Sequence, residues 1–463
     1  LLLPCYWQSR IQAGDLSSHI YNSWLAELVE GGHVHGLAVV RQSTNVLFDL
    51  LLSDLFRWMG ADWAQRIAAS IAVLVFVWGA FAFVSAVSER RAWPLLPAIA
   101  MLAYGWVFHM GFFNFYLALG LSFWAMALFW RPTGWRVAAA TGVLAIACTA
   151  HALPVLWAGG LMAYTWVARR LRARARALLV TGAVALLAVA HFAVAHALVS
   201  VWSPIQLSLA IGADQVWVFD GKYYFIQAAL VLVWGFFLLD LLHTRAGLDL
   251  ISSIPFHLCA LCAAAVCFLP TTVLIPGYRH ALVYIAERMS LGTGICVCAM
   301  LGTGRLRAVG RYGLMALALA YFAFLFRDEQ ALNRFEDRVQ AAVNQIPAGQ
   351  RAVSPLIDPE LRVNALTHMI DRACVGRCYS YANYEPSTAQ FRIRAPGDNP
   401  YVTARYKDSW DLQNGKHVVQ REELPLWQLE VTDEGRIGLR QLKAGVLNGS
   451  VLWNVLTNRK PKS

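Results

Sequence analysis

Charged side chains are scarce in this sequence. Asp, Glu, Lys and Arg make up 14% of the chain, whereas about 25% is usual for a soluble globular protein. Hydrophobic residues make up 58%, and they are concentrated in long runs such as 67–87, 177–199 and 223–242. Each run is close to the roughly 20 apolar residues that cross about 30 Å of hydrocarbon as a helix. The scarcity of charge therefore argues against an ordinary soluble chain and predicts a polytopic integral membrane protein.

The sequence also lacks internal repeats and low-complexity segments. Repeats are frequent in secondary transporters, so their absence counts against that class. The formal net charge is +11, which can indicate nucleic-acid binding. The arginines, however, cluster at the ends of apolar runs, at 90–91, 131–136, 169–176 and 305–311. Basic residues in short loops mark the cytoplasmic side of a membrane, so we expect membrane lipid, and not nucleic acid, as their partner.

The arginine clusters also orient the predicted helices. When every arginine cluster is placed on the cytoplasmic side of the membrane, successive apolar runs cross in alternating directions without exception. The runs occupy residues 67–88, 94–108, 115–130, 137–150, 154–168, 177–199, 223–243, 256–275, 289–301 and 309–326. Residues 1–7 are interpreted as the end of a truncated first helix, which gives about eleven helices. The predicted fold class is mainly α, a multi-pass transmembrane helix bundle of a bacterial inner membrane.

A domain boundary is predicted after residue 326. Residues 1–326 form the transmembrane domain, with an external first loop at 8–66. Residues 327–463 form a small extracytoplasmic α/β or α+β domain, because this tail is polar and combines helical periodicity with short strand-like runs. Cys374 and Cys378 lie in the tail and can form a short-loop disulfide if it faces an oxidising compartment.

The segment 12–32 of the first loop, QAGDLSSHIYNSWLAELVEGG, carries the most informative pattern. Its apolar residues recur at helical spacing, and the glycine pair at its end suits a helix terminus. Asp15 stands at the expected N-cap, and His19 follows one turn later, so the carboxylate and the imidazole can approach each other. Asp15 either only caps a helix lying along the membrane, or serves as a general base, with His19 as the second catalytic candidate. Both interpretations are open at this point.

The architecture resembles the GT-C superfamily of integral membrane glycosyltransferases, which includes enzymes of the protein mannosyltransferase kind. The resemblance rests on an external first loop with an early acid, helices of uneven length and a C-terminal external domain, and it covers residues 1 to 326. The stretch GDLSSHIYNSWLAELVEGG is similar to the family's first-loop signature. The resemblance implies a polyprenyl-phosphate-linked sugar as donor and Asp15 as catalytic base. Many members carry an Asp-Glu pair here, whereas this chain has Asp15-Leu16, which puts a role for a divalent cation (Mg²⁺ or Mn²⁺) in doubt.

Other polar residues map to the external edge of the predicted bundle. They are His109, Asn114, His151, Arg279, His280 and Arg288. Singly, an interfacial His or Arg usually caps a helix or reaches toward the headgroups. Gathered at one edge with Asp15 and His19, these residues predict a substrate site. Arginine suits phosphate through its bidentate fork, so Arg279 and Arg288 are the candidates for holding the donor phosphate, with His280 as a helper.

Together these residues predict an enzyme, a hexosyl- or pentosyltransferase. It would move a sugar from a polyprenyl-phosphate donor to a hydroxyl of a protein, lipid or glycan on the extracytoplasmic side. The alternatives are a membrane transporter or lipid flippase, and a non-enzymatic assembly protein of the cell envelope. An enzyme must bring Asp15, His151 and Arg288 together, whereas an assembly protein need not. Asp49 is either a second acid near the site or, as we expect, a residue of a solvated helix face, and no set of metal ligands is predicted.

Overall fold

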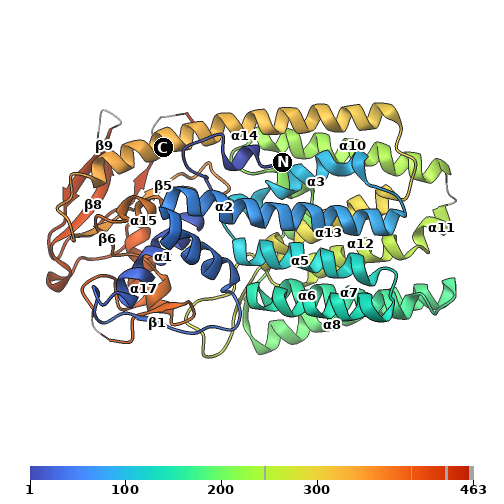
Figure 1. Ribbon diagram of the computed structural model, residues 1–463, viewed down its shortest axis with the longest axis horizontal. Helices are drawn as coiled ribbons and strands as arrows, with labels where there is room; N and C mark the ends of the chain where they lie inside the picture. The colour runs from blue at the N-terminus through green and yellow to red at the C-terminus, as the bar shows by residue number, and fades with distance from the viewer. Residues whose placement is uncertain (245–246, 398, 433–435, 458–463) are drawn as a thin grey trace.

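The computed structural model describes residues 1–244, 247–397, 399–432 and 436–457, and the chain is mainly helical. Figure 1 shows a bundle of helices along the long axis and, at one end, a region of short strands and short helices. We call this second part the cap region. It comprises α1 (Leu16–Glu30), β1 (Ala38–Val39) and the described residues from 344 to 457. The bundle end beneath it is the cap end, and the opposite end is the arginine end.

Apolar helices form the bundle. Six helical segments are long and apolar enough to cross a membrane: α2 (Leu47–Ser88), Trp93–Met110, α8 (Ala173–Ala197), α10 (Lys222–Thr244), α13 (Ile285–Gly302) and α14 (Ala308–Val343). Shorter apolar helices accompany them: α5 (Phe113–Phe129), α6 (Gly134–Ala150), α7 (Ala152–Ala168) and α12 (Ile254–Phe268). The smaller connecting helices are α9 (Gln206–Leu209), η3 (Ala213–Val216) and α11 (Gly247–Ile251). These helices are consistent with a membrane protein.

Each apolar run expected from the sequence coincides with one of these helices, with two differences. In the run 256–275 the helix ends at Phe268, because Pro270 follows and disfavours helical backbone in the residue before it. The run then continues into β3 (Thr272–Leu274), which pairs with β2 (Val199–Val201). Residues 1–7 contain only the short 3-10 turn η1 (Leu3–Cys5), where the end of an apolar helix was expected.

Two of the long helices are interrupted. Within α2, Gly60 adopts φ 76° and ψ 176°, which places a kink between the part near the cap region and the rest. The segment Trp93–Met110 divides into η2 (Trp93–Leu95), α3 (Leu96–Ala103) and α4 (Trp106–Met110). A Cβ on Gly105 would lie 2.8 Å from the Gln215 carbonyl oxygen, so the close approach of η3 requires glycine here. Irregular backbone at membrane depth is tolerated where protein surrounds it.

Helix α14 joins the bundle to the cap region. It runs unbroken from Ala308 to Val343 along most of the molecule (Figure 1), so the boundary predicted after residue 326 falls inside a helix. Leu332, Phe335 and Val339, on its second half, are fully buried, and this half packs on α15 (Met369–Cys374). The apolar face of the expected tail helix is therefore the continuation of a long bundle helix.

Small sheets build the rest of the cap region. One has the strand order β6-β4-β8-β9, with β4 parallel to β6 and β8, and β8 antiparallel to β9. Its strands are β4 (Arg351–Val353), β6 (Tyr379–Ser380), β8 (Leu426–Val431) and β9 (Ile437–Gln441). The other elements are β5 (Leu356–Ile357), α16 (Glu385–Thr388), β7 (Ile393–Arg394), α17 (Tyr406–Gln413), η4 (Arg421–Glu423) and β10 (Val451–Leu452). A disulfide joins Cys374 to Cys378, the pair that the sequence analysis named as able to form one.

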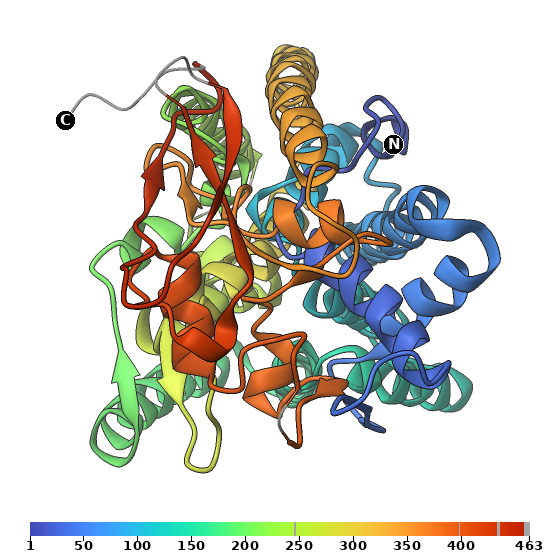
Figure 2. The same cartoon turned by 90° about the vertical axis from the view of Figure 1, so that its left-hand side faces the viewer.

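The first loop and the C-terminal region form one assembly. Strand β1 pairs antiparallel with β7, so a segment near the start of the chain shares a sheet with one near its end. Viewed onto the cap region, the last strands lie on one side and α1 on the other, with the orange segments between them (Figure 2). Helix α1 also packs on α15. Most of its side chains are therefore buried against protein.

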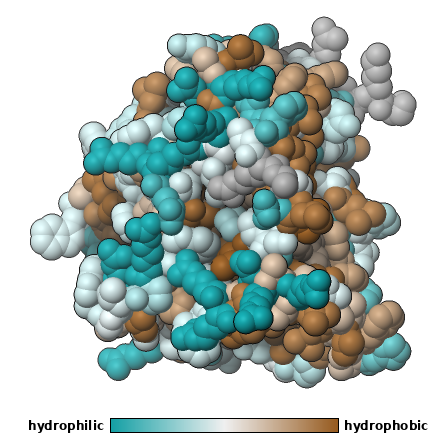
Figure 3. Space-filling view, turned by 90° about the vertical axis from the view of Figure 1, so that its right-hand side faces the viewer, coloured by the Kyte–Doolittle hydropathy of each residue, from teal (hydrophilic) through white to brown (hydrophobic). Residues whose placement is uncertain are grey.

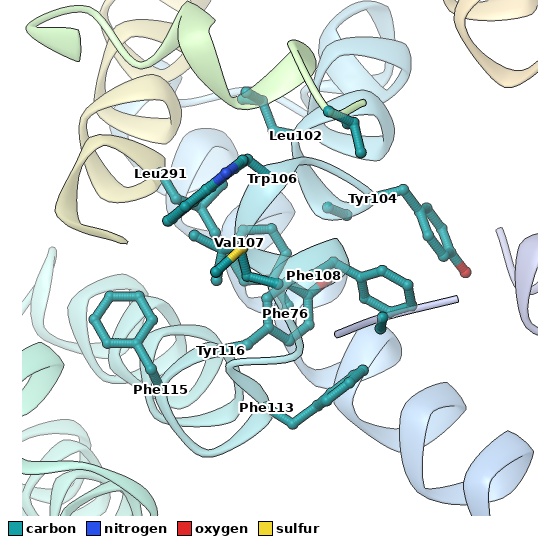
Figure 4. Close-up of a cluster of buried hydrophobic side chains, with 14 of the residues drawn as sticks. Phe76, Leu102, Tyr104, Trp106, Val107, Phe108, Phe113, Phe115, Tyr116 and Leu291 are labelled. Carbon is teal, nitrogen blue, oxygen red and sulfur yellow. The ribbon is translucent and has the colours of Figure 1, made fainter. Parts of the chain in front are cut away.

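Buried aromatic side chains pack below the cap region. Figure 4 shows Phe76, Phe108, Phe113 and Tyr116 gathered in one cluster. The rings of Phe76 and Tyr116 stack with centroids 4.5 Å apart, and Phe108 meets Phe113 edge to face at 5.2 Å. Such pairs contribute about 0.5–1.5 kcal/mol each beyond the area that they bury. The cluster fixes α4 against the start of α5, and the turn between these helices, at Gly111, supports the site described next.

Candidate active site

A cavity of about 400 Å³ lies between the cap end of the bundle and the cap region. The turn after α4 and the start of α13 line it from the bundle side. Residues 356–368 and α17 line it from the cap side. The predicted site residues on its wall are Asp15, His19, Asn114, His151, His280 and Arg288. The structure thus brings Asp15, His151 and Arg288 to one cavity.

Backbone hydrogen bonds hold Asp15 at the cavity. The Asp15 N–H donates to the Met110 carbonyl oxygen at 3.0 Å, and the Gly14 N–H donates to that of His109 at 2.8 Å. Asp15 occupies the N-cap position of α1, as predicted, but its side chain makes no capping hydrogen bond. The carboxylate, whose side chain is 20% exposed, lines the cavity instead. The interpretation that Asp15 only caps a helix is therefore wrong.

Gly111 makes this placement of Asp15 possible, and its substitution gives a test. Gly111 has φ +85°, and a Cβ there would lie 2.5 Å from the Asp15 backbone nitrogen. We expect Gly111→Ala to displace Asp15 and to lower the free energy of unfolding by about 1–3 kcal/mol or more. Gly32→Ala is the control, because Gly32 also has a positive φ of +72° but nothing within 4 Å of its Cβ position. Chemical denaturation and a turnover assay on both variants would separate backbone strain from displacement, and equal activities would argue against displacement.

Sequence reasoning missed a histidine of the cap region that faces Asp15. The His368 Nε2 lies 3.6 Å from the Asp15 Oδ1, and the His368 Nδ1 hydrogen-bonds the Asp371 Oδ2 at 2.8 Å. Asp371 is itself held by the Ser380 hydroxyl. Burial disfavours a charged imidazole, but the hydrogen bond and the charge of Asp371 outweigh it, so the pKa of His368 is raised. His368, held by Asp371, therefore faces the Asp15 carboxylate from the cap region.

The raised pKa of His368 predicts a pH dependence. Because its pKa is raised, His368 stays protonated at pH values above the ordinary histidine pKa of about 6.5. The stabilisation by its charge is complete at low pH and is lost as the pH rises through the raised pKa. Asp371→Asn removes the main cause of that shift. If Asp15 acts as a general base, we expect the alkaline limb of kcat/KM to move to lower pH in this variant, with activity about 10–100-fold lower. The control is Asp408→Asn, which removes the ion pair with the exposed Arg405 and should leave the alkaline limb of the pH profile unchanged. An unchanged alkaline limb in Asp371→Asn would show that Asp371 does not act through His368.

The structure gives His19 a different partner from the expected one. The His19 Nδ1 hydrogen-bonds the Asp49 Oδ1 at 2.6 Å, and the Asn114 amide donates to the Asp49 Oδ2 at 2.7 Å. Burial opposes the charge on His19, but Asp49 more than offsets it and raises the pKa of His19 to about 9. The expectation of a solvated face for Asp49 is therefore wrong. This pair tethers α1 to the start of α2 beside the cavity.

Another acid lies behind this wall. Glu385, in α16, is buried and accepts a hydrogen bond from the Ser18 hydroxyl at 3.4 Å. Burial raises the pKa of Glu385 to about 8. Glu385 does not line the cavity, whereas Asp15 does, so Asp15 is the better placed of the two acids.

The basic side of the cavity comes from Arg288, with two histidines near it. The Arg288 guanidinium lies 3.8 Å from the Phe112 ring centroid, and its buried Nε has no hydrogen-bond partner within the described part of the chain. Asp15 is near enough for its charge to act on Arg288. Burial, followed by the charge of Arg288, lowers the pKa of His280 and lowers that of His151 to about 3. Both imidazoles are therefore neutral, which suits hydrogen bonding to hydroxyl groups.

The comparisons with known proteins identify no relative. No family model, no curated protein and no solved structure matches this chain.

Two of the predicted site residues lie outside the cavity wall. His109 is fully buried, and its Nδ1 donates to the Gln12 carbonyl oxygen at 2.9 Å. Because its own carbonyl accepts from the Gly14 N–H, His109 holds the loop that carries Asp15. Arg279 is exposed and donates to the Ser387 carbonyl oxygen at 3.2 Å. Of the two candidate phosphate-binding arginines, only Arg288 lines the cavity.

The cap region adds residues that the sequence analysis did not single out. His368 and Asp371 stand three positions apart, a spacing that lets side chains meet on a helical turn, and this was the available signal. The segment 379–386, rich in aromatics, supplies Tyr384 to the wall. Among the described residues there is no group of three or more His, Cys, Asp or Glu side chains arranged to hold a metal ion.

Proposed function

We propose that this protein is a membrane glycosyltransferase that moves a sugar from a polyprenyl-phosphate donor to an acceptor hydroxyl, with Asp15 as general base. The observation that carries the proposal is that Asp15 and Arg288 line the same cavity, at the end of an apolar helix bundle. A lipid-linked phosphate requires an apolar path for its chain, a cation for its phosphate and a base near the sugar. Asp15 and Arg288 line this cavity, and the bundle beneath it is built from apolar helices.

The proposed reaction balances with these groups alone. The acceptor oxygen attacks the anomeric carbon, and its proton passes to the Asp15 carboxylate. The bond from the anomeric carbon to the phosphate oxygen breaks, and its electron pair stays on the phosphate. Arg288, which has no carboxylate ion pair within the described residues, is placed to stabilise the charge that develops there. His368, held by Asp371, lies beside the base on the cap side of the cavity.

The cap side of the cavity suits a carbohydrate. Trp410 lines the wall and is 55% exposed, so a face of its ring is available to a sugar. Gln413 and Asn414 follow on the same wall with hydrogen-bonding amides. An aromatic plane beside polar side chains can pack on the C–H face of a sugar and bind its hydroxyls. This favours the transferase over a path for an ion.

We place the cap end on the extracytoplasmic side. Helices α2, α6, α7, α8, α13 and α14 present arginines at their opposite ends, and short basic loops are retained in the cytoplasm. The donor and the acceptor would then bind in the cavity at the extracytoplasmic side of the membrane. Cysteine labelling of the exposed Asp54→Cys variant from outside intact cells, compared with Arg131→Cys, would test this orientation.

A donor assay tests the function directly. The purified full chain in detergent would be mixed with radiolabelled polyprenyl-phosphate hexoses or pentoses and with solubilised envelope material as acceptor. We expect protein-dependent release of polyprenyl phosphate and transfer of label to one acceptor fraction. The same sugars as nucleotide diphosphates serve as controls and should not react, because they lack the apolar chain. The absence of turnover with every lipid-linked sugar, together with transport activity in vesicles without a donor, would overturn the proposal in favour of a transporter.

A further inference from the structure

A second cavity, of about 310 Å³, lies at the arginine end, far along the bundle from the candidate active site. Four arginines line it: Arg90 and Arg91 follow α2, Arg305 follows α13, and Arg311 belongs to the first turn of α14. The Arg90 guanidinium donates to the Gly302 carbonyl oxygen at 2.8 Å, which ties two of these elements together. The arginines therefore come from separate elements that meet around one hollow.

No acidic residue lines this cavity within the described chain. Neighbouring arginines at the same end have counter-charges, because Arg131 pairs with Glu89 and Arg307 pairs with Asp240. In contrast, Arg91, Arg305 and Arg311 form no ion pair in the part of the chain that the structure describes. Guanidinium groups gathered without a counter-charge repel one another, and an anion at their centre relieves the repulsion.

The remaining wall is apolar. Pro94, Leu95 and Leu306 contribute to it beside the arginines. Figure 3, which faces the arginine end, shows hydrophilic and hydrophobic side chains next to each other on this surface. A small inorganic anion would use only the basic part of such a wall. A phospholipid would use both, because its phosphate meets the arginines and its first methylene groups meet the apolar side.

We propose that this cavity is a binding site for the phosphate-bearing headgroup of an anionic phospholipid, with arginine forks as phosphate ligands. The site is separate from the proposed transferase cavity and serves to anchor the ends of α2, α13 and α14 to the lipid of that leaflet. Binding stabilises the folded chain, since the three helix ends are held together only while the folded state lasts.

The test uses the purified full chain in a neutral detergent. Thermal unfolding would be followed during titration with a phospholipid carrying two phosphates, with zwitterionic phosphatidylcholine and with inorganic pyrophosphate. The variant Arg91→Gln/Arg305→Gln removes two lining arginines and keeps the Arg90 bond to Gly302. The matched control, Arg172→Gln/Arg174→Gln, makes the same change of charge at exposed arginines of the same end that do not line the cavity.

We expect the anionic lipid to raise the unfolding temperature, and the concentration for half effect to increase at least about tenfold in the lining variant but not in the control. If the lining variant does not fold, Arg91→Lys/Arg305→Lys should show a smaller weakening, because lysine keeps the charge and loses the fork. Pyrophosphate competing with the lipid would assign the affinity to the phosphate group, and failure to compete would assign part of it to the apolar wall. An equal loss in both glutamine variants, or no response to the anionic lipid, would overturn the proposal.

Discussion

Asp15→Asn is expected to reduce glycosyl transfer by about 10²–10⁴-fold while the protein still inserts and folds. General-base catalysis by a placed side chain is typically worth that factor. Asparagine has the shape of aspartate but does not accept the proton of the acceptor hydroxyl. Folding should be nearly unaffected, because Asp15 is positioned by its backbone N–H bond to Met110 and its side chain makes no capping bond. The measurement is the initial rate of label transfer, with the unfolding temperature recorded beside it.

Asp54→Asn is the matched control for Asp15→Asn. Asp54 is an exposed acid of α2, 3.6 Å from Arg57, and exposed pairs of this kind contribute little to stability. We expect its transfer rate to equal that of the unsubstituted protein. A normal rate in Asp15→Asn would show that another group takes the proton. A rate lost equally in both variants would show a loss of insertion instead.

The bundle could be predicted from the sequence because a membrane span is a local property. Each apolar run supplies the length and composition of a helix without help from distant residues. The interruptions depend on tertiary contacts. The break at Gly105 exists because η3 approaches the backbone there, and nothing within the run 94–108 indicates that neighbour. The sequence analysis placed a boundary inside α14 because the composition changes at residue 327. The backbone hydrogen bonding does not change there, and the helix continues to Val343.

The site could be predicted in part. Asp15, His151 and Arg288 were identified because ionisable residues at the edge of apolar runs are conspicuous. Asp49 was assigned to a solvated face because its own helix is the only context that the sequence provides, and its bond to His19 comes from another element. His368 lies in a tail with ordinary polar composition. Its role follows from the packing of α15 against α1, which brings opposite parts of the chain together.

Arg288 is the residue whose loss should resemble that of Asp15 most closely. In the proposed reaction the leaving phosphate gains charge as the sugar departs, so a cation near it stabilises the transition state more than the ground state. The guanidinium is held over Phe112 on the cavity wall, and its buried Nε has no partner in the described chain. The neutral His151 and His280 on the same wall do not provide that charge.

We therefore expect Arg288→Gln to lower kcat by about 10²–10³-fold, the cost usually seen when a group that stabilises transition-state charge is removed. Arg288→Lys should recover part of this loss, because lysine restores the charge without the bidentate fork. Arg279→Gln is the control, since Arg279 donates to Ser387 outside the cavity and should retain a normal rate. Steady-state kinetics with the lipid donor distinguish the roles: a change in KM alone would mean that Arg288 binds the donor without assisting the departure of the phosphate. A fall in kcat that Lys partly reverses requires the charge to act when the bond breaks.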